Sequence, residues 1–84
     1  AEAAHKSNVQ MLKSAALVRQ NEMKAGDKDV NWPNNEDPKN YVEKWPDVPA
    51  GLKNNNGSQA PKSYIVTITP DSITVTPDES ELKK

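Results

Sequence analysis

The sequence predicts an α+β domain in which one long N-terminal helix packs against a small antiparallel β-sheet. Residues 1–25 contain neither proline nor glycine and are rich in residues that favour helices. Near the other end of the chain, two short runs of β-branched residues are separated by a turn. A two-stranded hairpin is marginal by itself, so we expect it to pack on the helix in a two-layer arrangement.

The helix predicted over residues 1–25 has one apolar edge. Gly26 comes directly after it, in the position typical of a left-handed C-terminal cap. The first two turns offer little to bury, so we expect them to project from the domain. The residues that share the predicted buried edge, at spacings of three and four, are His5, Val9, Leu12, Ala16, Arg19 and Met23.

Residues 26–62 are predicted to form a loop region that contains one short helix over 38–44. Asp37 is the expected N-cap of that helix, and Pro38 occupies its first position. The helix should end before Pro46, because the residue preceding a proline avoids helical geometry. We expect Tyr41 and the two tryptophans, Trp32 and Trp45, to fill the edge of the core.

The clearest β signal is a hairpin within residues 63–76. Its strands are predicted over 64–69 and 73–76, and Pro70, Asp71 and Ser72 supply the turn. Residues 77–84 are predicted to be a frayed, charged tail. Together these segments indicate one domain spanning 1–84.

Composition excludes several classes of function. The chain has no cysteine, which excludes disulfides, thiolate metal sites and a cysteine nucleophile. Its net charge is −1, from 11 basic and 12 acidic residues, so no basic field favours a nucleic-acid partner. No run approaches the roughly 20 apolar residues that span a bilayer.

One segment has the opening spacing of a calcium-binding EF-hand loop: Asp27, Asp29 and Asn31. The match then fails, because Trp32 stands where the loop requires glycine and Pro38 where it requires a bidentate glutamate. A solvated acidic turn is the preferred interpretation, a calcium site of another type is the alternative, and no cofactor is predicted.

No arrangement of residues predicts catalysis. His5 is the only histidine, and no activating partner is identifiable from the sequence, so we expect a surface or packing residue. The chain is therefore not predicted to be an enzyme, and no catalytic residue is assigned. The tryptophans flanked by proline, Trp32 and Trp45, are the candidates for an exposed interaction pair, with burial in the core as the alternative.

Three segments, in this order, resemble type IV pilins and pseudopilins. Residues 3–16 resemble the second half of that family's long N-terminal helix, residues 41–51 its connecting segment with tyrosine and prolines, and residues 64–76 its sheet. The family's apolar first half-helix and its disulfide-bounded loop are absent from this sequence. The resemblance therefore implies a pseudopilin or a Gram-positive pilin, with an apolar segment expected before Ala1.

The resemblance implies a structural subunit of a type IV pilus, or of a secretion or competence pseudopilus. Such a subunit is anchored in the membrane before assembly and then lies in a filament at the cell surface, with copies of itself and other pilin-like subunits as partners. The alternative is a small extracellular module that binds carbohydrate or peptide through Trp32 and Trp45. The helix residues that the resemblance places toward the filament axis are Ala1, Ala4, Ser7, Asn8 and Met11.

Overall fold

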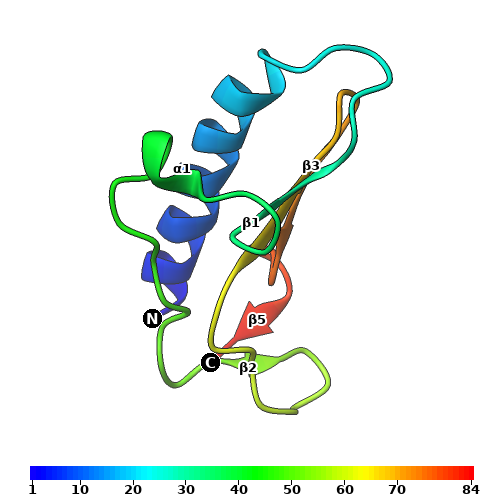
Figure 1. Cartoon of the computed structure of the whole chain (residues 1–84). Helices are drawn as coiled ribbons and strands as arrows, with labels where there is room; N and C mark the ends of the chain where they lie inside the picture. The colour runs from blue at the N-terminus through cyan, green and yellow to red at the C-terminus, as the bar shows by residue number, and fades with distance from the viewer.

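A computed structural model describes the whole chain, Ala1–Lys84, and confirms the α+β class. One N-terminal helix lies along one side of small antiparallel sheets, and both chain ends lie at the same end of the molecule (Figure 1). The elements are α1 (Glu2–Gln20), β1 (Val30–Trp32), the 3-10 helix η1 (Pro38–Asn40), β2 (Lys53–Asn54), β3 (Ile65–Ile68), β4 (Ile73–Thr76) and β5 (Leu82–Lys83).

The strands form two sheets. The main sheet has the order β1-β3-β4, and its central strand β3 pairs antiparallel with both neighbours. The register pairs Asn31 with Thr67 on one side and Thr67 with Thr74 on the other. The second sheet joins β2 to β5, which lie close to the chain ends (Figure 1).

The predicted buried edge of the helix is confirmed in its first four members: His5, Val9, Leu12 and Ala16 are each at most 1% exposed. The predicted length is wrong, because α1 ends at Gln20 and Gly26 belongs to a later turn. Gln20 donates to the carbonyl of Thr69, in the turn of the β3–β4 hairpin, over 3.0 Å. Met23, the last member of the predicted edge, follows the end of the helix and is partly buried against the core. The expected projection of the first turns is also wrong, because His5 is buried.

The hairpin is confirmed, with β3 and β4 close to the predicted strands. Val66, Ile68 and Val75 point into the core against the helix and are at most 1% exposed. The prediction that residues 26–36 form only a loop is wrong, because β1 adds a third strand there. Val30 and Trp32 are buried and Asn31 between them is not, which is the alternation of a half-buried strand.

The short helix predicted over 38–44 is a single 3-10 turn over Pro38–Asn40. Its predicted start is confirmed: the Asp37 side chain accepts a hydrogen bond from the Lys39 amide over 3.0 Å. The turn ends at once because Val42 leaves it to enter the core, where it is 5% exposed. Trp32 stacks on Tyr41 with ring centroids 5.3 Å apart, which closes this edge of the core.

The tail predicted to fray over 77–84 is ordered. Leu82 is 6% exposed, and the strand β5 that contains it pairs with β2. The amide nitrogen of the Asn55 side chain also donates to the carbonyl of Ser80 over 3.0 Å. Burial of one leucine and these backbone pairs hold a segment whose composition is otherwise charged.

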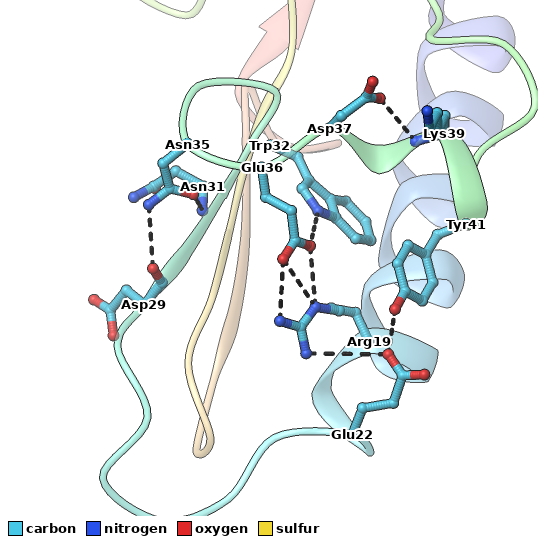
Figure 2. Close-up of polar contacts among 10 residues, drawn as sticks. All are labelled: Arg19, Glu22, Asp29, Asn31, Trp32, Asn35, Glu36, Asp37, Lys39 and Tyr41. Carbon is cyan, nitrogen blue, oxygen red and sulfur yellow. Dashed lines mark hydrogen bonds and ion pairs between the residues drawn. The ribbon is translucent and has the colours of Figure 1, made fainter.

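The outer edge of β1 is covered by one side chain. Asn35 Oδ1 accepts from the Asn31 amide over 2.7 Å, and Asn35 Nδ2 donates to the Asp29 carbonyl over 3.3 Å (Figure 2). The Asn35 amide donates in turn to the Asn31 carbonyl over 2.8 Å. Asn35 therefore satisfies backbone groups that a free edge strand offers to other chains.

Replacing that side chain by Asn35→Ala should destabilise the domain by about 1 kcal/mol and increase its self-association, because the Asn31 amide loses its acceptor. Urea unfolding and analytical ultracentrifugation measure the two effects. Asn34→Ala is the matched control, since Asn34 is exposed and its side chain makes no hydrogen bond. Equal behaviour of the two variants would contradict this role of Asn35.

Candidate functional site

A buried polar cluster joins the start of α1 to the start of β3 and to the C-terminal segment. His5 Nδ1 lies 2.7 Å from the Tyr64 hydroxyl, and His5 Nε2 lies 2.8 Å from the carbonyl oxygen of Asp78. His5 and Tyr64 are almost completely buried, and their rings stack with centroids 5.7 Å apart. Of the two expected alternatives, a surface or a packing residue, His5 is therefore the packing residue.

The partners of His5 determine where its proton sits. A carbonyl oxygen only accepts, so Nε2 carries the proton that binds Asp78. In the neutral imidazole, Nδ1 has a lone pair and accepts from the Tyr64 hydroxyl. Asn8 Nδ2 donates to that hydroxyl over 3.4 Å. Burial raises the pKa of Tyr64, although the Asn8 hydrogen bond acts in the opposite direction. In the series of hydrogen bonds from Asn8 through Tyr64 and His5 to Asp78, every donor therefore faces an acceptor.

The Asp78 side chain is outside this chain of donors and acceptors. It lies 3.1 Å from Lys13 Nζ, and it also accepts from the Glu79 amide over 2.8 Å. Partial burial opposes ionisation, but the Glu79 amide and Lys13 together hold the pKa of the Asp78 carboxyl below its usual value. The segment that begins at Asp78 is therefore fixed to α1 by both its carbonyl and its side chain.

A second polar cluster lies at the other end of α1 (Figure 2). Arg19 binds Glu36 with two nitrogens: Nε lies 3.0 Å from Oε2 and Nη2 lies 3.0 Å from Oε1. The indole of Trp32 donates to Glu36 Oε2 over 2.9 Å. Tyr41 completes the cluster by donating to Glu22. The two-point geometry fixes the orientation of the guanidinium as well as its distance from the carboxylate.

The charges of this cluster stabilise one another. The hydrogen bonds from Arg19 outweigh partial burial and, with the Trp32 indole, lower the pKa of Glu36. The same contact with Glu36 raises the pKa of Arg19. Arg19 on α1 and Glu36 in the loop each have a partner of opposite charge, so the arrangement is suited to holding α1 against the loop.

The two tryptophans of the candidate interaction pair differ in how deeply they are buried. Trp32 is 0% exposed, so it is not part of an exposed pair, and the expectation that it fills the edge of the core is confirmed. Trp45 is half-buried and packs edge-on against Trp32 with ring centroids 6.4 Å apart. The indole nitrogen of Trp45 is buried and has no hydrogen-bond partner. The alternative of burial in the core therefore holds for Trp32.

Two of the three residues considered for calcium have other partners for their side chains. The Asp27 carboxylate accepts from the Lys24 amide over 2.8 Å, in a local turn. Asn31 Oδ1 accepts from the Thr67 hydroxyl over 2.8 Å, on the face of the sheet. The Asp29 side chain makes no hydrogen bond or ion pair. No group of three or more histidine, aspartate or glutamate side chains is arranged to hold a metal ion.

Most of the helix residues that the resemblance places toward the filament axis lie on the surface of the domain. Of the predicted assembly residues, Ala1, Ala4 and Ser7 are exposed, and Met11 is 38% exposed. Asn8 differs, because it is half-buried and bonds Tyr64 and the Asp47 carbonyl.

The outer side continues beyond Met11 to two residues that the sequence reasoning missed. Leu17 is 51% and Val18 is 55% exposed. A second stripe runs along the helix at alternating steps of three and four residues. It consists of Ala4, Ser7, Met11, Ser14 and Val18. That spacing was readable from the sequence. We define the outer face of α1 as Ala4, Ser7, Met11, Ser14 and Val18, all of which are exposed; Leu17 lies about 100° further around the helix, at the border of this face.

An open pocket of about 490 Å³ lies between segments 47–52 and 59–63. The Val48 amide donates to the Lys62 carbonyl over 3.1 Å at one end, and a bridge between Lys53 and Gln59 closes the other. No aromatic residue lines the pocket, and its charged lining is Asp47 and Lys62. It is therefore separate from both tryptophans.

Comparison with known proteins identified no matching family model, no similar characterised protein and no similar solved structure. The helix of this chain is also not apolar enough to cross a lipid bilayer. Function is therefore inferred from the chain's own residues.

The buried hydroxyl gives a first test of the His5 cluster. Tyr64→Phe should destabilise the domain by about 1–3 kcal/mol, because His5 Nδ1 becomes a buried acceptor without a donor. Tyr41→Phe is the control, because it removes a tyrosine hydroxyl that contacts Glu22 at the surface. Its cost in unfolding free energy should be much smaller. Chemical denaturation measures both. Equal costs would show that the His5 contact contributes nothing specific.

The pH dependence of Glu36 gives a second test. Its pKa is lowered on folding, so its contribution is complete above the unfolded pKa and is lost as the pH falls through the folded pKa. Glu36→Gln should cost about 1–3 kcal/mol at neutral pH, and the difference from wild type should vanish in acid, where Glu36 is neutral. Thermal unfolding across this range measures it. Glu43→Gln is the control, because Glu43 is exposed and has no partner, and its stability difference from wild type should not change in this way with pH. A stability difference for Glu36→Gln that does not depend on pH would refute the account.

Proposed function

We propose that this chain is the globular part of a structural subunit of a helical surface filament, of the type IV pilus or pseudopilus kind, and that it assembles through its N-terminal helix. The observation that carries the proposal is the outer face of α1. Four large hydrophobic side chains of the domain are exposed, and three of them, Met11, Leu17 and Val18, lie on this one helix. Met11 and Val18 lie on the same side of the helix, and apolar residues gathered on one exposed side typically mark a contact surface.

The pattern on the outer face suits close packing between helices. Ala4 and Ser7 are small, and they precede the larger Met11 toward the helix centre. Small residues let helix backbones approach, and the larger apolar side chains beyond them add area to bury. In the proposed filament, each subunit presents this face to a neighbour in head-to-tail contacts that do not close into a ring.

The way the helix is held also supports assembly. The His5 cluster fixes α1 near its start and the Arg19–Glu36 contact fixes it near its end. A helix held at two points offers a rigid face, which reduces the ordering cost of association. Asn8, which the resemblance places toward the filament axis, is engaged within the domain, so the proposed contact surface excludes it.

The proposal defines partners and location. The partners are copies of this chain and other pilin-like subunits. An apolar segment before Ala1 anchors the subunit in the membrane until assembly, and the finished filament lies at the cell surface. The loops 26–37 and 47–62 then face outward. No catalytic step is part of the proposed function.

The alternative, a small extracellular module that binds sugar or peptide through two exposed tryptophans, loses its main support. Trp32 is completely buried, which leaves one half-buried ring. A stacking site needs an accessible ring face, and the pocket between 47–52 and 59–63 contains none.

The proposal is tested in cells that make the protein. Met11→Glu should reduce the amount of subunit in sheared surface filaments by about tenfold or more, because a charge is buried between helices without a partner. Ile65→Glu is the matched control: Ile65 is 41% exposed against 38% for Met11, but lies on β3.

Filament incorporation is measured by immunoblotting of the sheared fraction, after unfolding curves show that both variants fold. Equal incorporation of the two variants, or absence of the wild-type chain from any surface filament, would overturn the proposal.

A further inference from the structure

The turn that comes after β2 is an exposed but well-ordered segment. The Asn54 amide donates to the Ser58 carbonyl, and the Gly57 amide donates to the Asn54 carbonyl, each over 2.9 Å. Asn56, Gly57 and Ser58 at its tip are all exposed. A side chain there is accessible to water while its neighbours have defined positions.

Within this turn, one asparagine side chain receives two hydrogen bonds at a single atom. The Ser58 amide lies 3.0 Å from Asn56 Oδ1, and the Ser58 hydroxyl lies 2.6 Å from the same oxygen. Gly57 lies between Asn56 and Ser58 in the sequence. Its φ is +87°, a conformation that glycine adopts without strain. A Cβ atom at Gly57 would meet nothing within 4 Å, so the surroundings of its backbone are open.

We propose that Asn56 is a site of spontaneous covalent modification, at which the chain converts its own asparagine to aspartate or isoaspartate. The Gly57 amide nitrogen gives up its proton to water or hydroxide and forms a bond to Asn56 Cγ. The bond from Cγ to Nδ2 breaks, and Nδ2 takes up a proton and leaves as ammonia. Water then opens the five-membered imide at either carbonyl. The net change is consumption of one water and release of one ammonia, without oxidation or reduction.

The Ser58 donors are placed to promote the first step. When the nitrogen attacks Cγ, negative charge develops on Oδ1, which already accepts from both the amide and the hydroxyl of Ser58. Donors that are in position where charge develops lower the barrier without reorganisation. The Gly57 amide must first leave the Asn54 carbonyl. Exposed turns open at low free-energy cost, so this step is accessible.

Asn56 differs from the other asparagines in the residue on its C-terminal side. It is the one asparagine that precedes a glycine, whereas Asn34, Asn54 and Asn55 each precede another asparagine. A side chain on the next residue crowds the attacking nitrogen. Asn34 is exposed as Asn56 is, and therefore serves as an internal reference in the same molecule.

The modification changes the surface beside the β2–β5 sheet. It replaces a neutral amide by a carboxylate, which takes the formal net charge from −1 to −2. The isoaspartate form also adds a methylene to the backbone next to Asn55, whose side chain holds the Ser80 carbonyl over 3.0 Å. Modification therefore acts on the contact between this turn and the C-terminal segment.

The test is incubation of the purified protein at mildly alkaline pH, and then intact mass measurement and peptide mapping. The expected result is the mass increase of replacing NH₂ by OH, located at Asn56 and absent from Asn34, with a rate that rises with pH. Asn56→Ala should abolish the increase. Ser58→Ala should slow it by roughly three- to tenfold, as expected for loss of one hydrogen bond to the developing charge.

Two results would overturn the inference. The first is no conversion at Asn56 under conditions that convert a reference peptide with the sequence Asn-Asn-Gly-Ser. The second is a Ser58→Ala rate equal to or faster than wild type, which would mean that the two hydrogen bonds protect Asn56. Because Ser58 is exposed in a turn, the variant is expected to fold, and its unfolding curve checks this.

Discussion

The packing of one helix edge on a three-stranded sheet is the constraint on which the rest of this domain depends. Only 15 of the 84 residues are buried, so few contacts supply most of the hydrophobic stabilisation. Val9, Leu12 and Ala16 are completely covered, and Val66, Ile68 and Val75 cover them. With no disulfide and so small a core, removal of the helix would leave the apolar face of the sheet without a partner. Val42, just after the 3-10 turn, belongs to this core, whereas Leu52 and Leu82 of the smaller sheet region are buried outside it.

Polar contacts at both ends convert this packing into a fixed helix position. His5 is tied to Tyr64 and to the Asp78 carbonyl at one end, and Arg19 is tied to Glu36 at the other. Apolar packing is not directional, whereas hydrogen bonds of this geometry define rotation about the helix axis. Rotation is what determines which residues remain outside. The buried contacts and the proposed assembly surface are therefore opposite sides of the same helix, and the first determines the second.

The sequence alone was sufficient to predict the elements whose apolar or β-branched residues recur at a regular spacing. The helix edge from His5 to Ala16 and the hairpin around Pro70 are predicted by spacing and β-branched residues, and both are confirmed. Strands of two or three residues, such as β1 and β5, are too short to give a periodic signal, and their pairing depends on distant partners. The contacts of His5 and Arg19 were missed for the same reason: their partners lie 59 and 17 positions away. Trp32 was a candidate for an exposed pair because a proline follows it, and its burial depends on the pairing of β1 with β3, which the sequence alone does not show.

The central claim is that the outer face of α1 is a surface of assembly. The chain contains no cysteine, so a single introduced thiol reports on one position without background. Ser7→Cys places it on the outer face and Ser80→Cys places it in the exposed C-terminal segment. The most direct measurement is the rate of thiol labelling in the isolated domain and in surface filaments from the producing cell. The account predicts that both positions react in the isolated domain and that Ser7→Cys alone becomes protected in filaments. Equal labelling of both positions in filaments would contradict it.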